Sequence, residues 1–145
     1  MGCNALNVRR TMRAVTQLYD HALAKTGLRS TQLPILVTVC LNPGARVKDL
    51  ADKMGMDPSS MVRNLRPLER EGLIELRQHE SDGRAKTAFI TDAGQEKVTT
   101  AHGAWSGVQT RLRQELGGEW YTVREALSEL GNAARVVATP ELQPA

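Results

Sequence analysis

Serine and arginine side chains recur at helical spacing along the segment 57–71, which makes it the first candidate for chemistry. A hydroxyl can hydrogen-bond to a phosphate or a base edge, and an arginine can donate to both O6 and N7 of guanine. The side chains that could do so are Ser59, Ser60, Arg63 and Arg66. An ordinary solvated helix face carries the same residue types, with arginines paired to nearby carboxylates. The segment alone favours neither interpretation.

A second basic group follows at a predicted hairpin. The stretch Asp82-Gly83-Arg84-Ala85-Lys86 comes directly after Glu80-Ser81, and Asp-Gly is typical of a tight turn between strands. We expect Arg84 at the tip of the projecting loop, held by Asp82, where its guanidinium could enter a minor groove. Lys86 starts the returning strand. Solvated charges on an ordinary turn are the alternative, but the nearby serine and arginine helix favours a nucleic-acid contact.

Hydrophobic periodicity, interrupted by glycine and proline, predicts the elements that position these side chains. A helix over 5–25 ends at Gly27, and a second helix, capped by Ser30 or Thr31, runs to about Asn42. The later segments are a short extended piece at 45–47, a helix at 48–54, and a helix at 57–71 that Asp57 caps. Strands at 73–78 and 86–90 enclose a hairpin tip at 80–83. A long helix at 92–116, capped by Thr91 or Asp92, and a last helix at 119–138 follow.

This order predicts a mainly α protein with a small β-hairpin wing. Residues 31–91 have the layout of a winged helix-turn-helix. The segments 5–25 and 92–138 are long amphipathic helices, which have no partner inside a chain of this length. We therefore treat residues 1–145 as one domain whose terminal helices need a further surface to cover them.

Composition narrows the function classes. The chain has 145 residues, 41% of them hydrophobic, and a net charge of +3. Residues 45–91 contain nine basic and eight acidic side chains, so a nucleic-acid surface must come from segregation of charge and not from excess. The sequence contains no phosphate-binding glycine loop, no nucleophile elbow and no H-E-x-x-H motif, so we expect neither an enzyme nor a cofactor. The absence of a long apolar run favours a cytoplasmic protein outside the membrane.

Two stretches resemble the MarR (multiple antibiotic resistance regulator) family. The run L-A-D-K-M-G-M-D-P-S-S-M-V-R-N-L-R-P-L-E-R-E-G-L-I is similar to the helix-turn-helix of that family, and S-D-G-R-A-K-T-A-F-I-T-D-A-G is similar to its wing. V-T-Q-L-Y-D-H-A-L and A-W-S-G-V-Q extend the similarity over most of the chain.

The resemblance implies a homodimeric regulator, usually a repressor, that binds a pseudo-palindromic operator in double-stranded DNA. Ser59, Ser60, Arg63 and Arg66 would lie in the major groove, and Arg84 in the minor groove with Lys86 nearby. The helices at 5–25 and 92–138 would form the dimer. The candidates for that interface or its core are Met12, Val15, Leu116, Tyr121, Val123, Leu127, Leu130 and Val137.

The resemblance also suggests how the protein would be controlled. Many family members release DNA on binding a small phenolic or carboxylate ligand, and Tyr19, His21 and Trp105 are candidates to line such a pocket, although core or surface roles fit each of them too. A redox branch of the family uses a cysteine near the N-terminus, and Cys3 is the candidate here. Asn7 stands where that branch has a tyrosine, so the match is incomplete. The three histidines are not spaced as a metal-ligand set.

Two other functions fit the same fold. A winged helix can bind another protein instead of DNA, because fold does not fix function. A general architectural DNA binder is also possible, and it would show strong salt dependence with little sequence preference. Basic residues on both the 57–71 helix and the hairpin favour sequence-specific DNA binding over the first of these.

Overall fold

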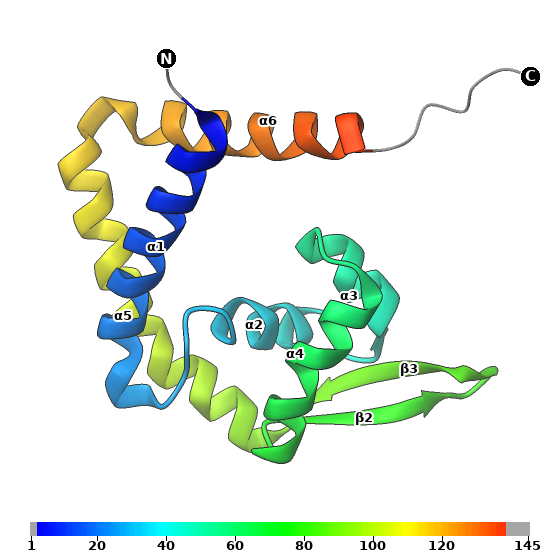
Figure 1. Ribbon diagram of the computed structural model, residues 1–145. Helices are drawn as coiled ribbons and strands as arrows, with labels where there is room; N and C mark the ends of the chain where they lie inside the picture. The colour runs from blue at the N-terminus through cyan, green and yellow to red at the C-terminus, as the bar shows by residue number, and fades with distance from the viewer. Residues whose placement is uncertain (1–2, 139–145) are drawn as a thin grey trace, which may run out of the picture. The chain divides into compact units, whose positions relative to one another are not determined.

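The computed structural model describes residues 3–138 and confirms a mainly helical fold with a small sheet (Figure 1). Its helices are α1 (Asn4–Leu23), α2 (Leu33–Leu41), α3 (Val47–Met54), α4 (Pro58–Arg70), α5 (Asp92–Leu116) and α6 (Trp120–Ala138). Its strands are β1 (Ala45–Arg46), β2 (Ile74–His79) and β3 (Asp82–Ile90). Short 3-10 turns at Ala24–Thr26 and Gly117–Glu119 follow α1 and α5.

The chain divides into two compact units at Val108, inside α5. The first unit contains every buried side chain of the described residues, whereas none of the side chains at 109–138 is buried within the chain. Helix α6 carries apolar residues along its length without covering them. Exposed apolar surface is costly in water, so burying these residues against a further surface would be favourable.

The core of the first unit comes from α1 to α5 and the sheet. Its fully buried members are mainly leucine, isoleucine, valine and methionine, as a sequence poor in aromatic residues requires. The largest of them are Leu23, Ile35, Leu36, Val39, Leu50, Met61, Leu65 and Leu68. Because α2, α3 and α4 all contribute, the packing of this core determines where the exposed face of α4 points.

Helices α3 and α4 meet at a tight turn. Gly55 ends α3 with φ of 63°, a left-handed conformation that glycine adopts without steric cost. The amide of Met56 donates to the carbonyl of Ala51 at 2.9 Å, and Ala51 is completely buried. The small side chain of Ala51 lets the two helices pack closely.

The sheet is antiparallel in the order β1-β3-β2. Its register pairs Ala45 with Ala88 and Ile74 with Ile90. The hairpin turn is Glu80-Ser81, shorter than the expected Glu80–Gly83 tip, because β3 already begins at Asp82. Figure 1 shows β2 and β3 as a ribbon that extends beyond α4.

The predicted cap of α2 is wrong. The residue before the helix is Gln32, and neither Ser30 nor Thr31 caps it. Instead, the amide of Ser30 donates to Oδ1 of Asp20 at 2.7 Å, ten residues earlier on α1. This hydrogen bond lowers the pKa of Asp20. A local sequence pattern cannot reveal a hydrogen-bond partner on another helix, so the position of Ser30 before an apolar run predicted a cap that does not form.

Between residues 3 and 138, no helix is both long and apolar enough to cross a bilayer.

Candidate nucleic-acid interface

Helix α4 begins at a fully formed cap. The carboxylate of Asp57 accepts from the backbone amide of Ser60 at 2.9 Å and from the hydroxyl of Ser60 at 2.6 Å. These bonds satisfy an amide that the first turn leaves without a helical partner. The hydroxyl of Ser60, followed by its amide, lowers the pKa of Asp57, and the positive charge of Arg63 adds to the effect. The predicted capping role of Asp57 is confirmed.

Ser60 connects this cap to an arginine. Its hydroxyl accepts from a guanidinium nitrogen of Arg63 at 2.8 Å while it donates to Asp57. The side-chain amide of Asn64 donates to the carbonyl of Ser60 at 2.9 Å. Arg63 is therefore held toward the start of α4 through Ser60, and not by a direct ion pair with Asp57. The sequence suggested such an ion pair but not the intervening hydroxyl.

The two long faces of α4 differ in character. Met61, Leu65 and Leu68 are buried against the core. Ser59, Arg63 and Arg66 have the same i, i+4, i+7 spacing, displaced by two residues, and all three are exposed. Burial of one face thus presents the other to solvent. Within residues 3–138 the side chains of Ser59 and Arg66 have no hydrogen bond or ion pair.

The wing carries Arg84 and Lys86 on β3, and both are exposed. The register shifts between Gln78 and His79, which leaves residues 83–85 between two paired stretches. Asp82 accepts from the backbone amide of Arg84 at 3.1 Å, so it holds the main chain of this irregular segment. The expectation that Arg84 lies at the tip is corrected: it follows the turn, within β3.

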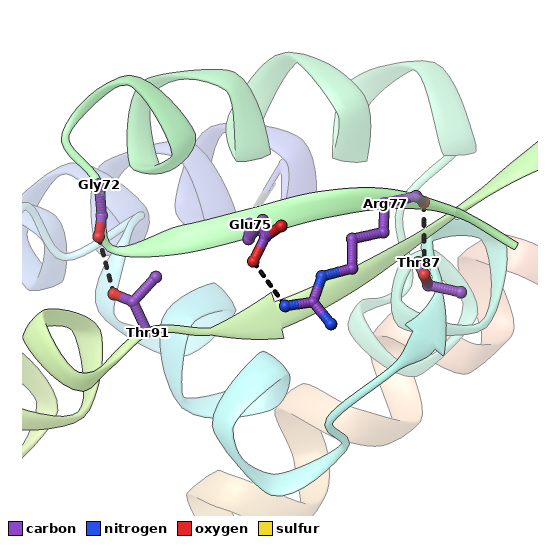
Figure 2. A network of polar contacts seen from close by, with 5 residues as sticks. All are labelled: Gly72, Glu75, Arg77, Thr87 and Thr91. Atoms are coloured by element: carbon purple, nitrogen blue, oxygen red, sulfur yellow. Dashed lines mark hydrogen bonds and ion pairs between the residues drawn. The ribbon is translucent and has the colours of Figure 1, made fainter.

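A polar cluster lies at the base of the wing (Figure 2). Arg77 donates to Glu75 at 2.7 Å, and its guanidinium lies 4.4 Å from the centre of the Phe89 ring. The hydroxyl of Thr87 donates to the carbonyl of Arg77 at 3.3 Å. Hydrogen bonding to Arg77 lowers the pKa of Glu75. This cluster was not among the sites predicted from the sequence, although alternation along β2 places Glu75 and Arg77 on one face.

The wing joins α5 at Thr91. The hydroxyl of Thr91 donates to the carbonyl of Gly72 at 2.7 Å, as Figure 2 shows, and accepts from the amide of Gly94 at 3.0 Å. The amide of Thr91 also donates to the carbonyl of Leu73 at 3.1 Å. Of the two predicted caps, Thr91 therefore makes the capping bond, and it links α5 to the end of α4.

A cavity of about 350 Å³ lies between α2 and α5. Its lining is mostly apolar and comprises Leu33, Pro34, Val37, Thr38, Val98, His102 and Trp105. Of the three pocket candidates from the sequence, Trp105 lines this cavity, whereas Tyr19 is half-buried and His21 is exposed on α1, away from its lining. His102 was missed; it stands three residues before Trp105, and their ring centres are 5.9 Å apart.

Cys3 has an exposed free thiol just before α1 and does not cap the helix through its side chain. Cys40 is also free and is partly buried on α2. Over residues 3–138, no three His, Cys, Asp or Glu side chains gather as metal ligands would.

Known proteins share both the sequence and the fold. The family model named MarR family matches residues 28–86. The M. tuberculosis transcriptional regulator MosR, solved in complex with DNA, is 30% identical over 95% of this chain and 100% of its own, with a TM-score of 0.88. The transcriptional repressor CouR, bound to a 23-mer DNA duplex, is 26% identical over 91% of this chain and 92% of its own, with a TM-score of 0.76.

A curated relative agrees with these structures. The HTH-type transcriptional regulator BilQ of Clostridium symbiosum is 26% identical over 115 residues, which are 77% of this chain and 80% of BilQ. The helix-turn-helix, the wing and the long flanking helices are therefore shared with transcriptional regulators along nearly the whole chain. By sequence and by fold, the chain belongs to the MarR family of transcriptional regulators.

Proposed function

We propose that this protein binds double-stranded DNA as a homodimer and represses transcription from a pseudo-palindromic operator. The observation that carries this proposal is the exposed face of α4, where Ser59, Arg63 and Arg66 lie opposite the buried face. The relatives MosR and CouR, both solved with DNA, support it. A bacterial-type regulator of this kind acts on the chromosome, so its place is the cytoplasm.

On operator DNA, α4 lies in the major groove. Arg66 is unengaged and can donate to a guanine edge, whereas Arg63 must leave Ser60 or bind DNA in the orientation that Ser60 imposes. Ser60, already bonded to Asp57, positions Arg63, and Ser59 is the hydroxyl free to contact phosphate. Specificity thus rests mainly on the two arginines.

The wing supplies the second contact. Arg84 lies in the irregular part of β3 and is exposed, so its guanidinium can enter the narrow, negatively charged minor groove. Lys86, exposed on the same strand, can contact phosphate. Arg77 at the base of the wing is already engaged by Glu75 and Phe89, which makes it a structural residue here.

Exposed apolar residues on α1 and α6 support a dimer. Met12 is 60% exposed and Leu127 is 53% exposed, which is unfavourable unless a second chain covers them. Others with the same character are Leu6, Val8, Val15, Leu18, Tyr121, Val123, Leu130, Val136 and Val137. A two-fold dimer would place its α4 helices for half-sites roughly 34–36 Å apart.

The cavity beside Trp105 fits a small aromatic effector with a phenol or carboxylate group. Its walls are apolar, and His102 is the titratable side chain that can bond to the polar end of a ligand. The hydroxyl of Thr38, which also lines it, lies 3.3 Å from the sulfur of Met54 at the end of α3. An occupied cavity can therefore influence the position of the helix-turn-helix.

The test is a titration of a labelled duplex carrying the upstream region of the gene, against a scrambled duplex at the same salt concentration. Arg66→Ala and Arg84→Ala should each weaken binding to the specific duplex by about 5- to 150-fold, because one base-reading arginine is worth about 1–3 kcal/mol. Arg111→Ala, which removes an exposed arginine of α5 outside α4 and the wing, is the charge-matched control.

Equal binding to both duplexes by all four proteins would contradict sequence-specific recognition by this surface. An equal loss in all three variants would indicate a non-specific charge effect. If only Arg66→Ala weakens binding to the specific duplex and Arg84→Ala binds as the wild type does, α4 contacts the bases and the wing does not contribute to affinity.

A further inference from the structure

A second cavity shares no lining residue with the cavity beside Trp105 and includes none of the residues proposed to contact DNA. It has a volume of about 610 Å³ and lies where the 3-10 turn after α1, the junction of α4 and β2, and the start of α5 meet. Its lining residues, which define what we term the lysine–glutamate cavity, are Lys25, Thr26, Glu71, Leu73, Ala93, Glu96, Lys97 and Thr100. All of them belong to the first compact unit.

Charges of both signs face this cavity without neutralising one another. Lys25 and Lys97 bring two ammonium groups, and Glu71 and Glu96 bring two carboxylates. Across residues 3–138 none of these four side chains forms an ion pair, although opposite charges line the same space. The lining therefore offers two cationic and two anionic groups that a bound molecule can pair with.

The two threonine hydroxyls of the lining already donate hydrogen bonds to backbone carbonyls. Thr26 donates to the carbonyl of Leu23 at 2.7 Å, and Thr100 donates to the carbonyl of Glu96 at 2.9 Å. The ammonium nitrogen of Lys97 lies close to Gly27, since a Cβ added at this glycine would be 3.5 Å from it. Recognition in this cavity therefore depends on the charged groups, with Lys97 reaching from α5 to the end of α1.

We propose that the lysine–glutamate cavity binds a zwitterionic small molecule, such as a free amino acid or a short peptide. The carboxylate of this ligand pairs with Lys25 and Lys97, and its ammonium pairs with Glu71 and Glu96. The volume lies within the range of about 300–1,000 Å³ that is usual for small-molecule sites. A purely anionic or purely cationic ligand fits less well, because it would leave two like charges beside it unpaired.

A ligand in this cavity would contact three elements at once. Glu71 and Leu73 flank Gly72, whose carbonyl accepts from Thr91 at the start of α5. The bound molecule would therefore link the end of α4 to α5 and α1, and would hold the junction from which the wing extends.

Binding can be measured without DNA, so its result stands apart from the proposed function. The full chain is titrated with each free L-amino acid and with trialanine, and binding is followed by calorimetry and by thermal unfolding. Lys97→Gln should weaken binding about tenfold, since it removes one charge-assisted contact. Lys53→Gln, an exposed lysine of α3 outside the cavity, is the matched control and should bind as the wild type does.

N-acetyl-trialanine and trialanine amide each keep only one of the two charges. Saturable binding of a zwitterion that is weakened in Lys97→Gln, retained in Lys53→Gln and lost for both blocked peptides supports the proposal. Equal binding of either blocked peptide would show a site for a single charge and would overturn it. Absence of saturable binding of every probe up to about 10 mM, or equal binding by Lys97→Gln and the wild type, would overturn it as well.

Discussion

Replacing a glycine of α5 by alanine should destabilise the fold at Gly94 and stabilise it at Gly103. At Gly94 an added Cβ would lie 2.1 Å from the carbonyl oxygen of Leu73 and 2.8 Å from a side-chain carbon of Ile90. A backbone oxygen cannot move aside as a flexible side chain can. The start of α5 must therefore move away from the carbonyl of Leu73 to make room for the added methyl group. At Gly103 an added Cβ would meet nothing within 4 Å.

The expected magnitudes follow from two opposing effects. Alanine stabilises a helix interior by about 1 kcal/mol relative to glycine, and overpacking costs about 1–3 kcal/mol. At Gly94 the close contact places the overpacking cost at about 3 kcal/mol, so Gly94→Ala should lower the free energy of unfolding by about 2 kcal/mol. Gly103→Ala should raise it by about 0.5–1 kcal/mol, because only the helix preference acts there.

Urea unfolding followed by circular dichroism, with all proteins at one protomer concentration, measures both changes. Thermal unfolding should place Gly94→Ala about 4–8 °C below the wild type. A Gly94→Ala protein as stable as the wild type would refute the reasoning that α5 packs against the Leu73 carbonyl. If Gly103→Ala is also destabilised, the open side of that glycine is occupied by a second chain in solution.

Three further predictions concern the proposed dimer, the cap of α4 and the cavity beside Trp105. If the proposed dimer forms through α6, Leu127→Asp should convert it to monomer in sedimentation velocity at micromolar concentration, because the substitution puts a charge into the apolar face of α6; a dimer that persists in the variant would place the interface elsewhere. Folding lowers the pKa of Asp57 from its ordinary value of 3.8, so this carboxylate stabilises the fold above pH 3.8, and that contribution disappears as the pH falls through the lower folded value. Asp57→Asn should therefore lose less stability than the wild type on acidification, measured by denaturant unfolding at several pH values, and parallel profiles would contradict this. Trp105→Ala should abolish release of operator DNA by salicylate, used as a probe with both phenol and carboxylate groups, and should retain DNA binding itself. Salicylate release that persists in Trp105→Ala would exclude this cavity.

Local sequence signals predicted most of the secondary structure, because each depends on a few neighbouring residues. Gly27, Gly55 and Gly72 all adopt positive φ at the ends of helical segments, and Asp57 caps α4 as expected. The serine and arginine face of α4 was also predicted, since burial of Met61, Leu65 and Leu68 leaves only the opposite side for solvent. These features would survive almost any arrangement of the helices.

The sequence by itself determined the order of the elements, the two faces of α4 and the family resemblance, because periodicity, capping and motif spacing are properties of neighbouring residues. Only the tertiary structure decided which polar groups meet. The amide of Ser30 donates to Asp20 on α1, and Ser30 does not cap α2. Arg77 contacts both Glu75 and Phe89, and four charged side chains from three segments line one cavity. Such contacts depend on how helices and strands pack, and no local pattern encodes the distance between residues that are far apart along the chain.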